Sequence, residues 1–269
     1  MGSEHQINCL INHVLKVFQQ IINRIITNKA YRNDQLGIIQ RYYNEGNNWN
    51  EHLINSKNYI LNALPAKTLN SIAILGSGWL LDVPVNELLD KTEQLFLIDI
   101  YHPKQIVNKY KNQKRVRFVK ADLTNDKVNA LIKSKTLTEF NAFMSDIQPI
   151  SFLNEYDFVV SLNLLNQLDI LLCDLIKHKF NVPDEHLIEI REKIQNNHLK
   201  SLPTGKSCII TDYVEINYIE KDKPISECNL IYTDINNLTN MHEWEWNFDT
   251  RKTYRQKMNS YFKVMAGKY

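Results

Sequence analysis

Five short apolar runs recur along the chain after residue 70, and longer stretches with helical spacing separate them. Each run is too short for a helix and is apolar at consecutive positions, as strands are when both faces of a parallel sheet are covered. Because each crossover helix covers one face, this alternation predicts an α/β fold with a doubly wound, mostly parallel sheet. The predicted strands are residues 71–75, 95–99, 116–120, 157–162 and 207–212, and the predicted helices are 83–89, 103–110, 127–135, 164–178 and 184–200.

The C-terminal part of the chain departs from this alternation. Residues 242–249 and 260–266 alternate apolar and polar side chains. Such a period of two indicates strands with one face buried and one face solvated. We expect a terminal antiparallel hairpin here, which brings the predicted sheet to seven strands.

The first 65 residues show helical spacing only. It predicts helices over 7–26, 36–43 and 49–64, the last of them ended by Pro65. We therefore divide the chain into a helical N-terminal extension at residues 1–65 and an α/β domain at 66–269. Tyr31, Tyr42, Tyr43 and Trp49 of the extension are expected either to line a pocket or to join the core.

Charge and cysteine content exclude several classes of partner. The formal net charge is +2, from 32 Lys and Arg against 30 Asp and Glu, without the concentrated positive charge of a nucleic-acid-binding protein. Segment 7–26 carries polar residues at helical intervals, so we expect an amphipathic helix and neither a membrane span nor a signal peptide. The cysteines follow no metal-ligand spacing, which indicates reduced thiols in the cytoplasm and no metal site: Cys9, Cys173, Cys208 and Cys228.

The first predicted strand runs into a glycine turn, in the segment SIAILGSGWLLDVPVNELL at 71–89. Ligands of doubly wound sheets bind beyond the carboxyl ends of the strands, where glycines let the backbone approach a ligand closely. Gly76, Ser77 and Gly78 occupy that place. A tight strand-to-helix turn without a ligand accounts equally well for a lone GxG pattern.

Acids end the next two predicted strands. Asp99, followed by Ile100, lies about 20 residues after the glycines, the separation at which a carboxylate accepts hydrogen bonds from ribose hydroxyls. Asp122 follows the third strand, where it can accept from an adenine amino group while Leu123 packs on the ring. The alternatives are an acid that faces solvent and a helix N-cap, a role that Thr124 also fits.

Polar side chains also follow the fourth and fifth predicted strands. Ser161, Asn163 and Asn166 are expected around the mouth of the same crevice, where amides orient a substrate or cap the next helix. Asp212 and Tyr213 are expected to close the fifth strand and to face the crevice. Asn163, Asp212 and Tyr213 are the candidate catalytic residues, because the first can position an acceptor and the other two can guide a proton.

The order of these motifs resembles the class I S-adenosylmethionine-dependent methyltransferases, which have a Rossmann-like fold. The resemblance runs from about residue 69 to residue 269. It is carried by the turn LGSGW, the acid Asp99, the ADL at 121–123, the NLLNQL at 163–168 and the closing hairpin.

The resemblance implies S-adenosylmethionine as the cofactor. The implied contacts are Gly76, Ser77 and Gly78 with its methionine part, Asp99 with the ribose, Asp122 and Leu123 with the adenine, and Asn163 near the sulfonium. Ile74 and Leu80 depart from the family pattern, which has an acid and often a third glycine at these two positions. These departures indicate a turn that is wider than usual.

A nicotinamide or flavin dinucleotide is the chief competing cofactor. The last glycine of its GxGxxG fingerprint is Leu81 here. Because Pro84 suits the first turn of a helix, we expect Asp82 to be the N-cap, with its carboxylate on the exposed amides. A pyrophosphate needs those amides and would meet a like charge, whereas S-adenosylmethionine carries positive groups. An exposed charge at a helix terminus changes the free energy of the helix or of a bound ligand by about 0.3–1 kcal/mol.

For the reaction, we expect methyl transfer to a small molecule or a protein side chain, with the small molecule favoured. Asn163 does not lie in the Asn/Asp-Pro-Pro-aromatic signature of enzymes that methylate nucleic-acid amino groups. His102 joins Asp212 and Tyr213 as a candidate base at the crevice. A methyltransferase-like scaffold without catalysis stays an alternative, and so does an extension that serves packing or a homodimer instead of the crevice.

Overall fold

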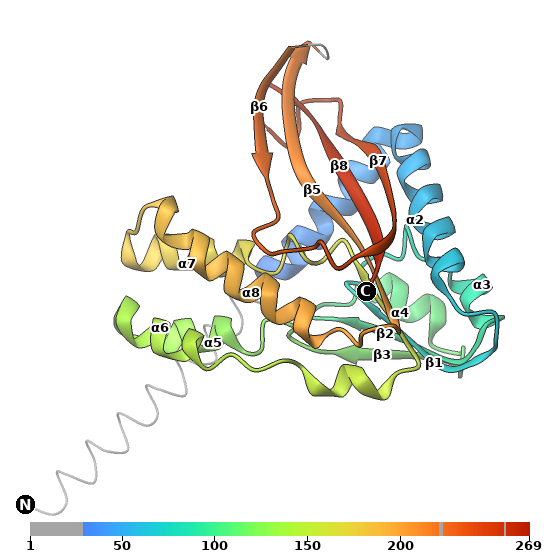
Figure 1. Ribbon diagram of the computed structural model, residues 1–269. Helices are drawn as coiled ribbons and strands as arrows, with labels where there is room; N and C mark the ends of the chain where they lie inside the picture. Colours follow the sequence, from blue (N-terminus) through green and yellow to red (C-terminus); the bar gives the residue numbers. More distant parts are fainter. Residues whose placement is uncertain (1–28, 221–222, 256) are drawn as a thin grey trace, which may run out of the picture.

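The computed structural model describes residues 29–220, 223–255 and 257–269, so the helix predicted over 7–26 lies outside the described residues. Its centre is an eight-stranded sheet in the order β3-β2-β1-β4-β5-β8-β7, with β6 paired to β5 off this path (Figure 1). The strands are β1 (Leu69–Leu75), β2 (Thr92–Asp99), β3 (Val116–Lys120), β4 (Phe158–Leu162), β5 (Ser207–Glu220), β6 (Lys223–Asn229), β7 (Thr239–Asp249) and β8 (Asn259–Lys268).

The first five strands are parallel, and the last three pair antiparallel. The connecting helices are α3 (Val85–Leu89), α4 (Lys104–Tyr110), α5 (Lys127–Lys133), α6 (Leu137–Ser145), α7 (Ile170–Phe180) and α8 (Ile188–Ser201). Short 3-10 turns, η2 (Ser151–Glu155) and η3 (Asp184–Leu187), complete the layers. The predicted doubly wound α/β fold with a terminal hairpin is therefore confirmed.

Each face of the sheet has its own core, as the apolar runs require. Alternate β1 residues divide between them: Ile72 and Ile74 face one side, and Ala73 and Leu75 face the other. The first core includes α2 (Asn50–Ala63), α3 and the aromatic residues of β7, and the second includes α5 to α8. Ile74, which stands where the family pattern has an acid, is fully buried in the first core.

Three sequence predictions about the elements were wrong. The sheet has eight strands instead of seven, because β6 is an edge strand whose side chains are mostly exposed and which has no apolar alternation to reveal it. β5 runs on to Glu220 instead of ending at residue 212, since β6 and β8 pair with its second half. The helix predicted from residue 164 begins at Ile170, after a turn that follows β4.

The described part of the N-terminal extension belongs to the same core as the sheet. A helical segment at residues 29–45 leads through η1 (Gly46–Trp49) into α2. The Trp49 ring stacks on Phe248 with centroids 5.6 Å apart, and its Nε1 donates to the Phe248 carbonyl at 3.1 Å. Tyr42 packs on Trp49, whereas Tyr43 is largely exposed. The domain boundary at residue 65 stays a prediction.

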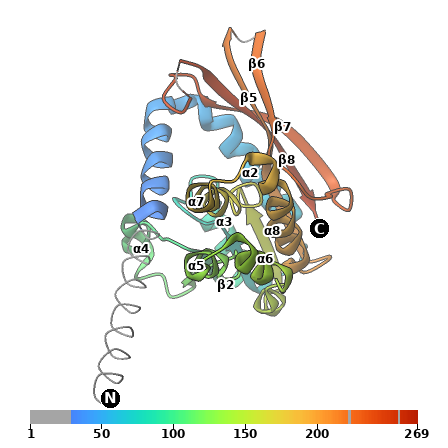
Figure 2. The ribbon, with the colours of Figure 1, turned by 90° about the vertical axis from the view of Figure 1, so that its left-hand side faces the viewer.

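The antiparallel strands stand over one edge of the parallel sheet. Because β5 continues past the ends of β1 to β4, its second half rises with β6, β7 and β8 beyond the carboxyl ends of the parallel strands (Figure 1). The segment 29–45 rises along the side of the molecule to these strands (Figure 2). The carboxyl edge of the sheet is thus bordered by a helix and by antiparallel strands.

Candidate functional site

The glycine turn packs tightly against the protein itself. Gly76 has φ +76°, and a Cβ there would lie 2.6 Å from the Leu162 carbonyl oxygen at the end of β4. Gly78 has φ +42°, and its Cβ would lie 3.1 Å from Gln35 Oε1 of the segment 29–45. Both positions therefore require glycine for close approach to the chain's own atoms. These close contacts hold the glycine turn at the carboxyl edge of the sheet.

Leu80 adopts the backbone of the glycine that it replaces. Its φ is +57°, a left-handed conformation that costs a branched side chain about 1–2 kcal/mol. Its amide donates to the Ser77 carbonyl at 2.9 Å, so the turn is tight and not the widened turn that the sequence suggests. Ser77 itself is buried, and its Oγ has no hydrogen-bond partner.

Asp82 is not the N-cap of α3, so that prediction was wrong. The helix begins at Val85 after Pro84, without a side-chain cap. Because the residue before a proline is held extended, Val83 separates Asp82 from the helix start. Its Oδ2 instead accepts a hydrogen bond from Asn163 Nδ2 at 2.8 Å. Burial raises the pKa of Asp82 to about 6, although hydrogen bonds and Lys57 oppose the shift.

Asp99 lies against the glycine turn, as the spacing predicts. Its Oδ2 accepts from the Gly78 amide at 2.9 Å, and its Oδ1 accepts from the Tyr101 amide at 3.1 Å. Burial raises its pKa, and these backbone bonds oppose the shift. Ile100 follows as a partly buried residue. The second strand and the glycine turn therefore share one edge, joined by a carboxylate that retains free lone pairs.

His102 lies beside Asp99 and orients one ring nitrogen away from the backbone. Its Nε2 donates to the Val119 carbonyl at 3.0 Å, which leaves Nδ1 as an acceptor. Nδ1 is buried and has no partner. The positive form of His102 would stabilise the charge of Asp99. This places His102 at the ends of β2 and β3, and among the acceptors around Asp99.

Asp122 forms a local turn with Thr124 and is not the N-cap of α5, which is Asp126. Its Oδ1 accepts from the amide and hydroxyl of Thr124, at 2.8 and 2.6 Å. Burial raises the pKa of Asp122. Burial also raises the pKa of Tyr31, and the charge of Asp122 adds to that shift, so Tyr31 approaches this acid. Leu123 is buried in the second core.

The turn after β4 brings two amides to the edge. Asn163 takes a left-handed φ of +47°, and its Nδ2 bonds to Asp82 while its buried Oδ1 has no partner. Asn166 Nδ2 lies 3.5 Å from Asp212 Oδ2, and its Oδ1 accepts from the Thr211 hydroxyl at 3.2 Å. Both asparagines thus hold their donors toward acids.

Ser161 does not lie at the mouth of the crevice. It is buried in β4, where its Oγ lies 2.8 Å from His198 Nε2 of α8. Burial lowers the pKa of His198 to about 4, so the imidazole is neutral. The prediction for Ser161 was wrong because side chains of a strand alternate between its faces, and Ser161 points to the second core.

Asp212 lies within β5 as a deeply buried acid of the site. It is only 2% exposed, and its Oδ1 has no partner. Burial raises its pKa to about 7, and the charges of Asp82 and Glu215 add to the shift. A carboxyl with a pKa near neutrality can give or take a proton at physiological pH.

Tyr213 does not accompany Asp212. It packs at the rim of the second core, and burial and the nearby Glu243 of β7 raise its pKa. A β-bulge between Asp212 and Val214 interrupts the regular pairing of β5 with β8 at Tyr213. Of the two, Asp212 is the residue that approaches Asp82 and Asn166.

The segment 29–45 supplies residues that the sequence pattern did not identify as part of the site. Gln35 faces Gly78, and its carbonyl accepts a hydrogen bond from Trp79 Nε1 at 2.6 Å. Farther along, the Arg41 guanidinium lies 4.6 Å from the ring centre of Phe248. The segment is therefore bound at both ends of the edge (Figure 2). Polar residues on an amphipathic helix carry no signal for such a role.

Buried acceptors without donors collect at this edge. In the described part of the chain, five such side chains lie at or over the carboxyl ends of the strands: Gln35, Ser77, His102, Asn163 and Asp212. In four of these side chains the unpartnered atom is an acceptor. For His102 this follows because its other ring nitrogen donates to the Val119 carbonyl. The Ser77 hydroxyl can both donate and accept. An unmet buried group costs about 1–3 kcal/mol, so five at one place favour a ligand that brings donors.

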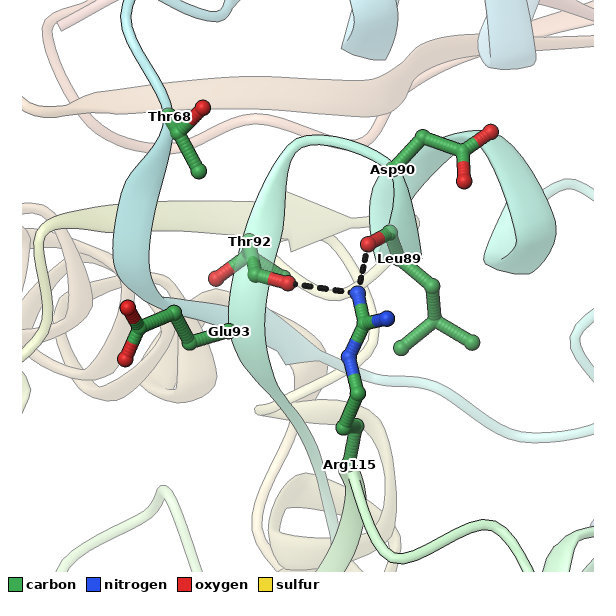
Figure 3. Close-up of a pocket in the computed structure, with 6 residues that line it drawn as sticks. All are labelled: Thr68, Leu89, Asp90, Thr92, Glu93 and Arg115. Atoms are coloured by element: carbon green, nitrogen blue, oxygen red, sulfur yellow. Dashed lines mark hydrogen bonds between the residues drawn. The ribbon is translucent and has the colours of Figure 1, made fainter.

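The two cavities described in the structure lie elsewhere. One, of about 450 Å³, opens at the amino ends of β2 and β3 (Figure 3). There Arg115 Nη2 already donates to the Leu89 and Thr92 carbonyls. The other, of about 300 Å³, is lined by residues of α6, α7, η3 and α8. Neither cavity adjoins the acids of the carboxyl edge. The cavities and the buried groups without hydrogen-bond partners therefore indicate different locations for a ligand site.

Within residues 29–220, 223–255 and 257–269, no group of three or more His, Cys, Asp or Glu side chains is arranged to hold a metal ion. The helices of these residues include none with the length and apolar character to cross a membrane. Cys173, Cys208 and Cys228 are free thiols.

The chain is similar to solved methyltransferases. No protein-family model and no curated protein matches it. Among solved structures, it is similar to the N-methyltransferase NodS of Bradyrhizobium japonicum WM9 with S-adenosyl-L-homocysteine, at 9% identity and a TM-score of 0.35 over 79% of this chain and 85% of that one.

Two further solved structures show how broad the likeness is. The DhpI–SAM–HEP complex is 10% identical, with a TM-score of 0.37 over 91% of this chain and 96% of that one. A protein assigned to the zinc-dependent alcohol dehydrogenases of Rhodobacter sphaeroides is 12% identical, with a TM-score of 0.32 over 58% of this chain and 46% of that one. At TM-scores below 0.5, these likenesses decide neither cofactor nor substrate.

Proposed function

We propose that this chain is an S-adenosylmethionine-dependent methyltransferase that acts on a small molecule. The observation that carries the proposal is the set of five donorless acceptors at the carboxyl edge, together with the acids Asp82, Asp99 and Asp122. S-adenosylmethionine presents donors of matching kinds: two ribose hydroxyls, an adenine amino group and a positive ammonium. When bound, the cofactor supplies a methyl group on a positively charged sulfur.

The acceptors fit the parts of this cofactor in order along the edge. Asp99 and His102 Nδ1 would hold the ribose hydroxyls, since both keep acceptor capacity beside the glycine turn. Asp122, whose Oδ1 alone is used by Thr124, would take the adenine amino group. Asp82 would lie near the positive methionine end, and Asn163 near the sulfonium, where the methyl acceptor also binds. These five side chains present acceptors to ligand donors that lose their hydrogen bonds to water on burial.

The remaining proposed contacts follow from their place on the chain. Gly76, Ser77 and Gly78 form the turn that borders the methionine end, and Ser77 brings an unpartnered hydroxyl. Ile100 and Leu123 flank Asp99 and Asp122 with apolar surface. Alignment of acceptor and methyl group supplies most of the acceleration in such transfers. The chain's contribution is to hold the two reactants and to exclude water beneath the segment 29–45.

A dinucleotide oxidoreductase is less well supported. A pyrophosphate would use the amides at the start of α3, but this helix has five residues and its N-cap is Pro84, which has no N–H. The carboxylate of Asp82 approaches the same edge and would repel phosphate. S-adenosylmethionine has no phosphate, so these features oppose one cofactor and suit the other.

A scaffold that binds only a partner has one observation in its favour. Gln35 covers Gly78 and Trp79 is bonded to the same residue, so the segment 29–45 closes the glycine turn. A protein without a ligand has no use, however, for five unmet acceptors beneath that segment. The free thiols of the described cysteines support the further proposal of a cytoplasmic location.

Thermal unfolding with two ligands tests the proposed function. S-adenosylhomocysteine at about 100 times its dissociation constant should stabilise the full chain by about 2.7 kcal/mol, whereas NAD should leave the midpoint unchanged. The control variant Asp90→Ala, changed at an exposed residue of the opposite edge, should respond to both ligands as the wild type does. Stabilisation by NAD alone would replace the proposal with an oxidoreductase, and stabilisation by neither would favour the scaffold.

A further inference from the structure

Asp212 is a buried acid whose carboxyl group has few hydrogen-bond partners. Its Oδ2 is 3.5 Å from Asn166 Nδ2, which is a long contact, and its buried Oδ1 has no partner. Thr211, its neighbour in β5, uses its hydroxyl on Asn166 Oδ1. Among these side chains, no donor is therefore left to satisfy Oδ1.

The charges around Asp212 are negative. Asp82 and Glu215 both oppose its ionisation. Glu215 is neutralised by Arg255, which donates to it twice at 2.7 and 2.8 Å. Arg41, the next cation of this region, lies over the rings of Phe248 and Tyr254 and is influenced by Asp249 and Glu45. Asp212 and Asp82 thus share one edge, and within the described residues no ion pair involves Asp212.

The neighbouring amides increase this acceptor character. Asn163 gives its Nδ2 hydrogens to Asp82 and leaves Oδ1 buried without a donor. Three acceptors are therefore linked at this edge: Asp82, which follows β1, accepts from Asn163, which follows β4, and the charge of Asp82 acts on Asp212 of β5. A group that satisfies them must carry positive charge and several N–H bonds, which describes an ammonium.

We propose that the methyl acceptor is an amine, bound as its ammonium ion by Asp212 and Asn163. This inference rests on the proposed function and deepens it, since it names the class of acceptor. A hydroxyl brings one hydrogen and no charge, and a carboxylate brings a repelling charge, so neither completes the three acceptors.

Asp212 also gives the amine its reactive form. The carboxylate takes one proton from the ammonium, which leaves a neutral carboxylic acid and an amine with a free electron pair. With the cofactor bound, the amine nitrogen would then bond to the methyl carbon as the carbon–sulfur bond breaks, and the electron pair of that bond would stay on sulfur. The methylated ammonium product carries the positive charge, so charge and atoms balance.

The experiment uses the smallest ammonium ion as its probe. The full chain is saturated with S-adenosylhomocysteine, and its thermal midpoint is measured in methylammonium chloride and in sodium chloride of equal ionic strength. We expect a midpoint higher by roughly 2 °C or more in methylammonium, and none of this gain in methanol. Asp212→Asn should abolish the gain, and Asp90→Asn, exposed at the opposite edge, should retain it.

The gain should also depend on pH. It should grow between pH 6 and pH 8, because the probe favours the carboxylate of Asp212, whose pKa lies at about 7. The other charged groups that face it are Asp82, Glu215 and Tyr254, with Lys57 acting on Asp82. Methylammonium keeps its charge over this range, as a lysine does.

The outcomes separate the two proposals. A response to S-adenosylhomocysteine without any response to methylammonium would overturn the amine acceptor and leave the methyltransferase. An equal gain in the Asp212→Asn variant or in methanol would overturn it as well. A methylammonium gain that depends on Asp212, in a chain that ignores S-adenosylhomocysteine, would support the ammonium site and reject the transferase.

Discussion

The two edges of the parallel sheet have opposite properties. At the amino edge there is an open hollow of about 450 Å³, and its polar groups are satisfied (Figure 3): Arg115 donates to two carbonyls, and nearby Asp157 accepts from the amides of Asn70 and Ser71. At the carboxyl edge five buried side chains lack donors. Unmet hydrogen bonding, and not the depth of a hollow, therefore marks the place for a ligand.

The largest loss of stability is expected from Gly76→Ala at the carboxyl edge. The new Cβ would lie 2.6 Å from the Leu162 carbonyl and hold φ at +76°. We expect the free energy of unfolding to fall by about 2–4 kcal/mol, since strain and a backbone clash add. Gly205→Ala is the matched control, because Gly205 has φ +74° but no atom within 4 Å. Its cost in denaturant unfolding should be about 1 kcal/mol; equal losses would show that the contact with β4 is unimportant.

The buried acid of the carboxyl edge should make stability depend on pH. Asp212 has a folded-state pKa of about 7 against an ordinary 3.8, so between these values the folded chain holds a proton that the unfolded chain has lost. The contribution of this group is full below pH 4 and is lost as the pH rises through 7.

Asp212→Asn removes this dependence. Relative to wild type, the variant should gain about 2–4 kcal/mol of unfolding free energy between pH 4 and pH 8. The lowered pKa values of His52 and His198, about 3 and 4, act in the opposite direction, but they cancel in the difference. Urea unfolding of both proteins across this range measures it. A constant difference would mean that Asp212 ionises normally.

The next smaller effect concerns ligand affinity at the same edge. Asp99→Ala removes the acceptor that the Gly78 and Tyr101 amides share with the proposed ribose. Affinity for S-adenosylhomocysteine should fall roughly 10- to 100-fold, the loss of one or two hydrogen bonds to a charged group. Competition with a labelled ligand measures it at 25 °C, where Asp99→Asn checks whether charge or the bond matters. Unchanged affinity in both variants would remove Asp99 from the site.

The smallest effect is expected at the amino edge. Arg115→Ala removes donors to the Leu89 and Thr92 carbonyls, which lie in partly exposed surroundings. We expect a loss of about 1 kcal/mol in unfolding and no change in affinity for S-adenosylhomocysteine. If Arg115→Ala weakened the ligand as much as Asp99→Ala, the contrast between the edges would be wrong.

Local sequence patterns predicted the parallel half of the molecule well. The five apolar runs became β1 to β5, and residues 116–120 match β3 at both ends. Asp99 could be placed against the glycines because both follow parallel strands whose carboxyl ends meet at one edge. Such a prediction needs only strand direction and order.

The rest depended on contacts between distant segments. Nothing in the letters around Asp212 shows that β5 continues, because its second half is held by β6 and β8. Asp82 was misplaced because the pattern of a proline near a helix start does not reveal the competing partner Asn163. The position of Gln35 over Gly78 joins residues 43 places apart, and helical spacing carries no record of it.

Calorimetric titration of the full chain with S-adenosylhomocysteine tests the central claim most directly. If the acceptors of the carboxyl edge form a cofactor site, the titration gives heat with a dissociation constant of micromolar order, and the heat is lost or strongly reduced in Asp99→Ala. The absence of heat at millimolar ligand, or the same isotherm in Asp99→Ala, would contradict the claim.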